Sequence, residues 1–230
     1  MLDAIIEAVG REPYFRDESV CIYHADCRDI LPLIPVGSVD LVLTDPSYNA
    51  KDIGPNQRPA LAGAGVDEEA YSSFCQEWFG AVRRLTDRMV FTCGIAHLWE
   101  YPPARWVVAW SKPSSVSYSR FGGFNVWEPI LFYGKLPKGK RIPRDLWQYD
   151  ALNFITEDWA KHPCPKPPAL WKKLVDSVSV ETDIILDPFL GSGTTLRAAK
   201  DLGRYAIGIE IEERYCEIAA KRMAQSVMAL

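Results

Sequence analysis

Two short motifs in the sequence combine residue types that could do chemistry. The first, Asp45-Pro46-Ser47-Tyr48, directly follows a run of apolar and β-branched residues. At the carboxyl end of a strand, such a motif places a carboxylate, a carbonyl oxygen and an aromatic ring at the sheet edge where ligands bind. Pro46 restricts Asp45 to an extended backbone, which helps to hold the carboxylate still. The motif therefore offers two hydrogen-bond acceptors beside a stacking surface, although Asp-Pro alone is also a common turn dipeptide.

The second motif is DPFLGSGTT at residues 187–195, between an apolar run and a segment of helical period. Gly191 and Gly193 let the backbone turn tightly and approach a ligand, to which the start of a helix offers N–H groups. Glu210 ends the next apolar run, 17 residues after Gly193, where a carboxylate can accept hydrogen bonds from two ribose hydroxyls. A dinucleotide fingerprint needs glycine where Leu196 stands, and a P-loop needs lysine where Thr194 stands. Both of these motifs are excluded, and a plain turn between a strand and a helix is the remaining alternative.

Short runs of β-branched and aromatic residues alternate with longer segments of helical period. Most of the runs are almost continuously apolar, as expected of strands that helices cover on both faces. The alternation predicts a single α/β domain, 1–230, with one doubly wound, mostly parallel, seven-stranded sheet. The predicted strands are Val20–His24, Val39–Thr44, Met89–Cys93, Trp106–Trp110, Pro129–Tyr133, Asp183–Leu186 and Tyr205–Glu210. The predicted helices are Glu69–Leu85, Pro167–Val180, Thr194–Leu202 and Glu212–Ala224.

Two stretches do not fit this pattern. Asn49–Val66 is rich in Gly, Pro and Ala and has no period, so we interpret 49–66 as a candidate mobile loop. Gly134–Pro168 holds several prolines, and 134–161 is a candidate insertion. Five cations in this second stretch, without an acidic neighbour, either face phosphate groups or belong to a solvated loop. This basic cluster consists of Lys135, Lys138, Lys140, Arg141 and Arg144.

Composition excludes several classes of protein. The 230 residues are 48% hydrophobic and 24% charged, which is enough apolar content for a packed core. No apolar run approaches the roughly 20 residues of a membrane span, and Met1–Gly10 is acidic where a signal peptide is basic. The six cysteines include no CxxC pair and the three histidines are scattered. We therefore expect a cytoplasmic protein without a metal site.

The two motifs together are more specific than either one alone. With DPSY first and DPFLGSGTT last, their order resembles the β group of the amino-methylating DNA methyltransferases, which act on adenine N6 or cytosine N4. Other blocks of the family are similar to YHADC at 23–27, VDLVLT at 39–44, WSKP at 110–113, WEPILFYGK at 127–135 and HPCPKP at 162–167. The chain departs from the family at Ser47, where proline is usual, and at 134–161, which is short for a target-recognition segment.

The resemblance implies S-adenosyl-L-methionine as cofactor and a flipped-out base of double-stranded DNA as acceptor, within restriction–modification chemistry. The implied catalytic residues are Asp45, Pro46, Ser47 and Tyr48. The implied cofactor-binding residues are Asp26, Cys27, Lys166, Asp187, Phe189, Gly191, Ser192, Gly193, Thr194 and Glu210. No metal is implied. Family members that begin the catalytic motif with Asp more often methylate adenine N6, so adenine is the expected acceptor. Cytosine N4, a DNA-binding relative without catalysis, and a homodimer remain open.

Overall fold

One mixed sheet organises the protein. The computed structural model describes residues 2–48, 67–113, 117–118, 123–150 and 166–225. In these residues the sheet has nine strands, in the order β1-β2-β11-β10-β3-β4-β8-β5-β9. The strands are β1 (Phe15–Arg16), β2 (Val20–His24), β3 (Leu41–Thr44), β4 (Met89–Thr92), β5 (Trp106–Ser111), β8 (Trp127–Tyr133), β9 (Leu146–Gln148), β10 (Ile184–Asp187) and β11 (Tyr205–Glu210). A separate ribbon pairs β6 (Ser117–Tyr118) with β7 (Phe124–Asn125).

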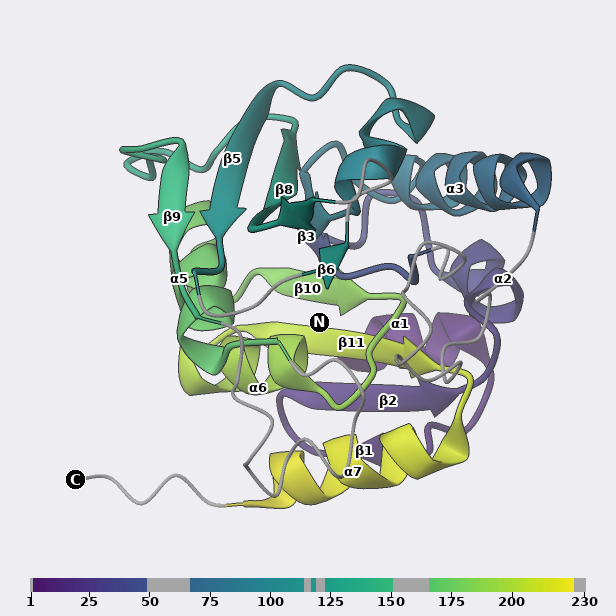
Figure 1. The fold of residues 1–230 in the computed structure, drawn as a ribbon. Coiled ribbons are helices and arrows are strands. Elements are labelled where there is room, and N and C mark those ends of the chain that lie inside the picture. The colour runs from purple at the N-terminus through teal and green to yellow at the C-terminus, as the bar shows by residue number, and fades with distance from the viewer. Residues whose placement is uncertain (1, 49–66, 114–116, 119–122, 151–165, 226–230) are drawn as a thin grey trace.

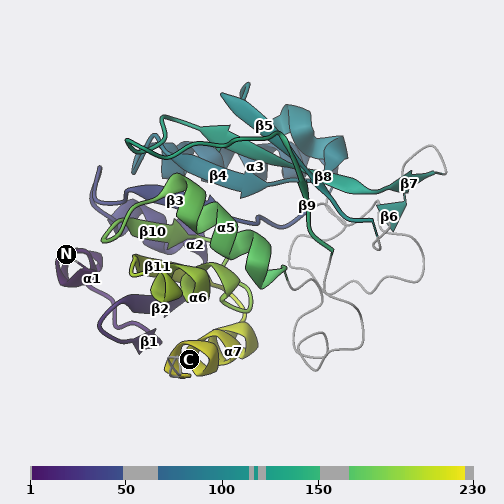
Figure 2. The same ribbon diagram turned by 90° about the vertical axis from the view of Figure 1, so that its left-hand side faces the viewer.

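Helices cover both faces of the sheet (Figures 1 and 2). On one face, α1 (Leu2–Val9), α2 (Cys27–Ile30) and α3 (Glu68–Arg83) pack their apolar side chains into one core cluster. On the other face, α5 (Pro168–Val178), α6 (Thr194–Asp201) and α7 (Glu213–Ala224) form a second cluster. Two short 3-10 helices, η1 (Leu31–Leu33) and η3 (Ile95–Glu100), complete the elements.

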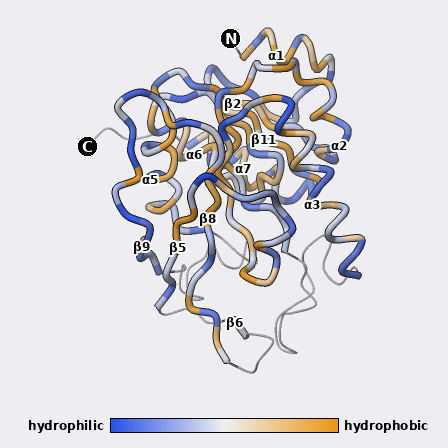
Figure 3. The backbone as a smooth tube through the Cα atoms, turned by 90° about the horizontal axis from the view of Figure 1, so that it is seen from above, coloured by the Kyte–Doolittle hydropathy of each residue, from blue (hydrophilic) through white to orange (hydrophobic). Residues whose placement is uncertain are grey.

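Successive residues of the central strands enter opposite clusters. In β2, Val20 and Ile22 belong to the cluster of α5, α6 and α7, whereas Cys21 and Tyr23 belong to the other. This alternation follows from the pleat of a strand. Hydrophobic backbone segments accordingly gather in the centre of the molecule (Figure 3). Both faces of the central strands are buried, which explains why the predicted strands are apolar at consecutive positions.

The predicted α/β fold with a mostly parallel sheet is confirmed. All seven predicted strands are present, with ends that differ by at most two residues. The sheet has nine strands instead of seven, because β1 and β9 pair with β2 and β5 at its two edges. Strands of two and three residues are too short to show a hydrophobic period. The four predicted helices correspond to α3, α5, α6 and α7, whereas α1 and the four-residue α2 were not predicted.

The strand order brings the two sequence motifs to the same edge of the sheet. β3 and β10 are parallel neighbours, with Val42 opposite Leu186. Their ends, Thr44 and Asp187, therefore lie side by side. β2, β11, β4 and β5 end at the same edge, and the antiparallel β8 begins there. We call this edge the carboxyl edge.

The basic cluster starts from the opposite edge. Tyr133, the last residue of β8, pairs with Met89, the first residue of β4. The chain then continues along that edge, where Lys140 forms an ion pair of 3.1 Å with Asp176 near the end of α5. Strand β9 runs back toward the carboxyl edge as part of the sheet (Figure 2). The other part of the candidate insertion, 151–161, and the candidate mobile loop, 49–66, lie outside the described residues, so both assignments stay predictions.

Candidate active site

The carboxylate of Asp45 lies at the centre of a polar cluster on the carboxyl edge. Its Oδ1 atom accepts a hydrogen bond from the hydroxyl of Thr92, at the end of β4, and another of 2.9 Å from the hydroxyl of Tyr48. Its Oδ2 atom forms an ion pair of 2.9 Å with the ammonium of Lys166, just before α5. Three separate segments thus orient one partly exposed carboxylate.

A second carboxylate backs this arrangement. Glu128, in β8, binds Lys112 through Oε1, and its Oε2 atom lies 3.9 Å from the ammonium of Lys166. The same Oε2 accepts a hydrogen bond of 3.4 Å from Tyr48. The ammonium of Lys166 also lies over two rings, 5.2 Å from the centroid of Tyr48 and 5.7 Å from that of Trp110. Two carboxylates and two ammonium groups balance each other's charge in a poorly hydrated place.

The backbone and the ring of the DPSY motif are both held. The carbonyl oxygen of Ser47 accepts a hydrogen bond of 3.0 Å from Tyr71 of α3, and Pro46 is buried. Burial raises the pKa of the Tyr48 hydroxyl well above its usual value, and the nearby charges of Asp45 and Glu128 raise it further. Tyr48 therefore stays protonated and remains a hydrogen-bond donor to Asp45.

Thr44 connects the two motifs. Its hydroxyl donates a hydrogen bond of 2.6 Å to Oδ1 of Asp187, which also accepts one of 3.1 Å from the backbone N–H of Phe189. Asp187 is only 2% exposed, and burial raises the pKa of its carboxyl to about 6, against the opposing effect of its hydrogen bonds to Thr195 and Thr44. The carboxyl of Asp187 thus fixes the start of the second motif from inside.

Glu210 holds the glycine turn of the second motif. Its Oε2 atom accepts a hydrogen bond of 2.7 Å from the N–H of Gly191, and Oε1 accepts one of 2.9 Å from the N–H of Glu212. Burial raises the pKa of Glu210. Gly193 precedes α6 with φ +84°, and a Cβ there would lie 2.9 Å from Cβ of Ala219. This second glycine is therefore required by packing against α7 as well as by its backbone conformation.

Asp26 follows the neighbouring strand β2. Its carboxylate caps α2 by accepting a hydrogen bond of 2.9 Å from the N–H of Arg28. It also pairs at 2.5 Å with the guanidinium of Arg28, whose hydrogen bonds lower the pKa of Asp26. Cys27 is buried beside it.

The predicted cofactor-binding residues fall into three groups. Asp26, Phe189, Gly191 and Glu210 are partly exposed at the carboxyl edge. Cys27, Asp187, Ser192, Gly193 and Thr194 are buried, and Arg222 of α7 donates to the hydroxyl of Thr194 at 3.0 Å. Lys166 lies against Asp45 instead, within the catalytic cluster.

Four side chains of the cluster were not among the predicted site residues: Tyr71, Thr92, Lys112 and Glu128. Two of them carried a detectable signal. Lys112 directly follows an apolar strand, and Glu128 is a charged residue in an otherwise apolar one. Thr92 and Tyr71 look like ordinary strand and helix residues, so no local pattern distinguishes them.

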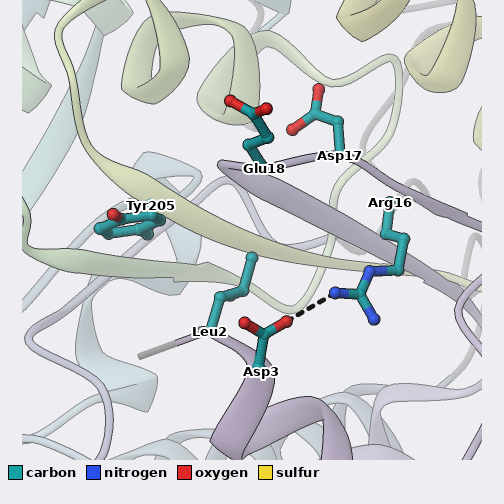
Figure 4. Close-up of a pocket in the computed structure, with 6 residues that line it drawn as sticks. All are labelled: Leu2, Asp3, Arg16, Asp17, Glu18 and Tyr205. Atoms are coloured by element: carbon teal, nitrogen blue, oxygen red, sulfur yellow. Dashed lines mark hydrogen bonds and ion pairs between the residues drawn. The ribbon is translucent and has the colours of Figure 1, made fainter.

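A cavity of about 480 Å³ lies away from this site (Figure 4). It is lined mainly by α1, β1 and the residues after β1, including the ion pair of 2.5 Å between Arg16 and Asp3. Tyr205, the first residue of β11, also lines it, which puts the cavity toward the edge opposite Asp45. Within the described ranges, no helix is long and apolar enough to cross a membrane, and no group of three or more His, Cys, Asp or Glu side chains could hold a metal ion.

Curated relatives match nearly the whole chain. The type II methyltransferase M.ScaI of Streptomyces caespitosus is 28% identical, over 98% of this chain and 88% of its own length. M.HinfI of Haemophilus influenzae is 30% identical, over 89% of this chain and 68% of its own length.

Solved structures share the fold. The PvuII DNA methyltransferase, which is cytosine-N4-specific, superposes with a TM-score of 0.74 at 18% identity and covers 96% of this chain and 92% of its own. The complex of M1.HpyAVI with SAM gives 0.64 at 24% identity, with 90% and 100% covered. A DNA modification methylase from Thermus thermophilus, in complex with S-adenosyl-L-methionine, gives 0.62 at 25% identity, with 88% and 92% covered.

A family model described as DNA methylase, that of the N6 and N4 methyltransferases, matches residues 105–221, which is just over half of the chain. This match includes Lys112, Glu128, Lys166 and the whole DPFLGSGTT motif. The chain therefore belongs to the N6/N4 amino DNA methyltransferases, which use S-adenosyl-L-methionine as methyl donor.

Proposed function

We propose that this protein transfers a methyl group to the exocyclic N6 amine of adenine in double-stranded DNA. The observation that carries the proposal is the position of Asp45. Its carboxylate lies beside the ring of Tyr48 on the carboxyl edge, and Thr44 connects the same loop to Asp187 at the start of the cofactor motif. An acceptor group for the base and a binding turn for the cofactor are thereby adjacent.

The residues at the end of β11 and β10 fit S-adenosyl-L-methionine. Glu210 is held by two backbone N–H groups, and a carboxylate has further lone pairs that can accept hydrogen bonds from ribose hydroxyls. Phe189 offers a partly exposed ring, and Asp26 a carboxylate on the neighbouring strand. We expect these residues to touch the cofactor, whereas the buried Cys27 and Asp187 shape the loops around it. When bound, the cofactor supplies a methyl group already activated on a sulfonium.

The catalytic motif can activate the amine. An exocyclic amine is a weak nucleophile because its lone pair is delocalised into the ring. If Asp45 and the carbonyl oxygen of Pro46 both accept its hydrogen atoms, the nitrogen becomes more tetrahedral and its lone pair is freed. Tyr48 can stack on the base, which contributes about 1–3 kcal/mol. The base must first leave the duplex stack, at a cost of a few kcal/mol, so positioning by these groups supplies much of the rate acceleration.

Adenine is favoured over cytosine by the first residue of the motif. Asp at the position of Asp45 is commoner among the adenine-N6 members of the family. The PvuII enzyme acts on cytosine N4, but at 18% identity it supports only the fold. Cytosine N4 is therefore the second candidate acceptor.

A DNA-binding relative without catalysis is less consistent with the site. Asp45 retains three oriented donors, from Thr92, Tyr48 and Lys166, and loss of catalysis would remove the need to keep them. Sequence recognition by 134–161 and a homodimer stay proposals, the latter testable by light scattering.

The test is product identification. Purified protein, S-adenosyl-L-methionine and mixed-sequence duplex DNA are incubated, and the DNA is digested to nucleosides and analysed by mass. N6-methyladenine is the expected product, and sequencing of the methylated sites then gives the recognition sequence. N4-methylcytosine would replace adenine with the second candidate, and DNA without added methyl groups would overturn the proposed function.

A further inference from the structure

We propose that Lys166 is a base-contacting residue, which donates a hydrogen bond to the ring nitrogen next to the target amine. This inference rests on the proposed function, because it concerns the same site. It assigns to Lys166 a role in reading the base in place of the cofactor contact predicted from the sequence. The contacts of its ammonium with Asp45, Tyr48 and Glu128 carry the argument.

The two oxygens of Asp45 have different surroundings. Oδ1 accepts hydrogen bonds from Thr92 and Tyr48, whereas Oδ2 faces Lys166 at 2.9 Å. Two donors crowd Oδ1, so an incoming amine is better accommodated by Oδ2, which has lone pairs beyond the one that Lys166 uses. An amine bound there lies directly beside the ammonium.

The aromatic contacts put the ammonium next to the stacking surface. It lies over the ring of Tyr48, 5.2 Å from the centroid. A base that stacks on this face of Tyr48 and bonds Asp45 through its amine must therefore turn the atoms next to that amine toward Lys166.

The pair of charges matches one kind of base edge. Adenine carries its N6 amine beside the acceptor N1, and cytosine carries its N4 amine beside the acceptor N3. Asp45 can only accept when ionised and Lys166 can only donate, so together they complement a donor next to an acceptor. Guanine and thymine present a ring N–H at the corresponding edge, which would meet the ammonium donor to donor. The Asp45–Lys166 pair thus selects amino bases, and it does not separate adenine from cytosine.

The surroundings hold the ammonium in place. Glu128 lies 3.9 Å from it and is itself neutralised by Lys112. The side chain of Lys166 is 14% exposed and that of Asp45 is 24% exposed. Hydrogen bonds from a charged donor are stronger where water is scarce, so loss of this bond should have a measurable effect on catalysis.

The experiment is a cycle of two enzymes and two substrates, at the recognition sequence found for the wild type. Wild-type protein and Lys166→Met are each assayed on duplexes with adenine or 1-deazaadenine as target, the latter having C–H in place of N1. Each single change should lower kcat/KM about tenfold to a hundredfold. Lys166→Met should lose nothing further on 1-deazaadenine, because the bond is already absent. Effects of the deaza ring on amine reactivity cancel, since both enzymes meet the same ring.

Equal and independent losses in the cycle would overturn the inference, since a structural lysine gives a factor that does not depend on N1. Lys112→Met is the matched control: it removes the other ammonium of the cluster and should keep the full sensitivity to 1-deazaadenine. Lys166→Arg should retain part of that sensitivity. Where Lys166→Met fails to fold, as judged by thermal unfolding, Lys166→Gln takes its place.

Failure of the proposed function is distinguishable from failure of this inference. If the wild type forms N4-methylcytosine, the same cycle with 3-deazacytosine tests Lys166 with the same expected pattern. If the wild type methylates no DNA, the proposed function and the inference fall together.

Discussion

Thr44 donates a hydrogen bond of 2.6 Å to Asp187 across 143 residues of sequence. Thr44 ends β3, which leads into the catalytic motif, and Asp187 ends β10, which leads into the cofactor motif. Both side chains are buried, at 0% and 2% exposed. The two motifs are therefore held in register by one contact inside the protein, beneath the surface where the reaction takes place.

Replacing Thr44 should destabilise the protein. Thr44→Val keeps the shape of the side chain but removes the hydroxyl, and Asp187 loses one of its hydrogen-bond donors. The free energy of unfolding should fall by about 1–3 kcal/mol, as for a buried polar group left poorly paired. Urea unfolding measures it, with Thr44→Ser as the control that keeps the donor. A valine variant as stable as the wild type would contradict the role of this contact.

Asp187 should make stability depend on pH. Burial raises the pKa of its carboxyl from 3.8 to about 6, so its contribution is fully present below the unfolded value and is lost as pH rises through about 6. Relative to Asp187→Asn, the wild type should lose about 3 kcal/mol of unfolding free energy between about pH 4 and pH 7. Denaturant unfolding of both proteins across this range is the measurement. A difference that does not change with pH would show that the carboxyl is not shifted.

Much of the fold could be predicted because its central strands are buried on both faces. Runs such as Val39–Thr44 are continuously apolar, and the residue after each run falls at the carboxyl edge, which is why Asp45 and Glu210 were identified. The short β1 and β9 lack a period, so their addition to the sheet edges could not be predicted from the local pattern.

The surroundings of Asp45 could not be predicted, because they come from separate strands. Thr92 ends β4 and Glu128 begins β8, and only the strand order brings both to Asp45. The same holds for Lys166, which was grouped with the cofactor motif by its neighbourhood in sequence. A tertiary contact leaves no local signal when its residues are ordinary members of their own elements.

Glu210 should set the affinity for the cofactor. Glu210→Ala removes the carboxylate that is proposed to bind the ribose and that also holds the N–H of Gly191. Binding should weaken by about 1–3 kcal/mol, measured by calorimetry with S-adenosyl-L-methionine and with its demethylated product. Glu212→Ala, an exposed neighbour, should bind normally. Unchanged affinity in Glu210→Ala would exclude the ribose contact.

The basic cluster should contribute little to DNA binding. The sequence alone suggested that it faces phosphate groups, but the segment begins at the edge opposite Asp45, and Lys140 is paired with Asp176. We therefore expect Lys138→Gln, Lys140→Gln and Arg141→Gln together to leave the slope of log affinity against log salt unchanged. A slope reduced by about 0.9 for each lost phosphate contact would instead mean that DNA reaches this edge.

The most direct test of the account is methyl transfer by Asp45→Ala, measured together with its cofactor affinity. Asp45 is proposed to act on the base, so turnover should fall by at least about 100- to 1,000-fold, while calorimetry should give a cofactor affinity close to that of the wild type. Asp29→Ala, which removes an exposed carboxylate of α2, should behave as the wild type in both assays. Near-normal turnover in Asp45→Ala would contradict the mechanism, and a large loss of cofactor binding would show that Asp45 contacts the cofactor instead of the base.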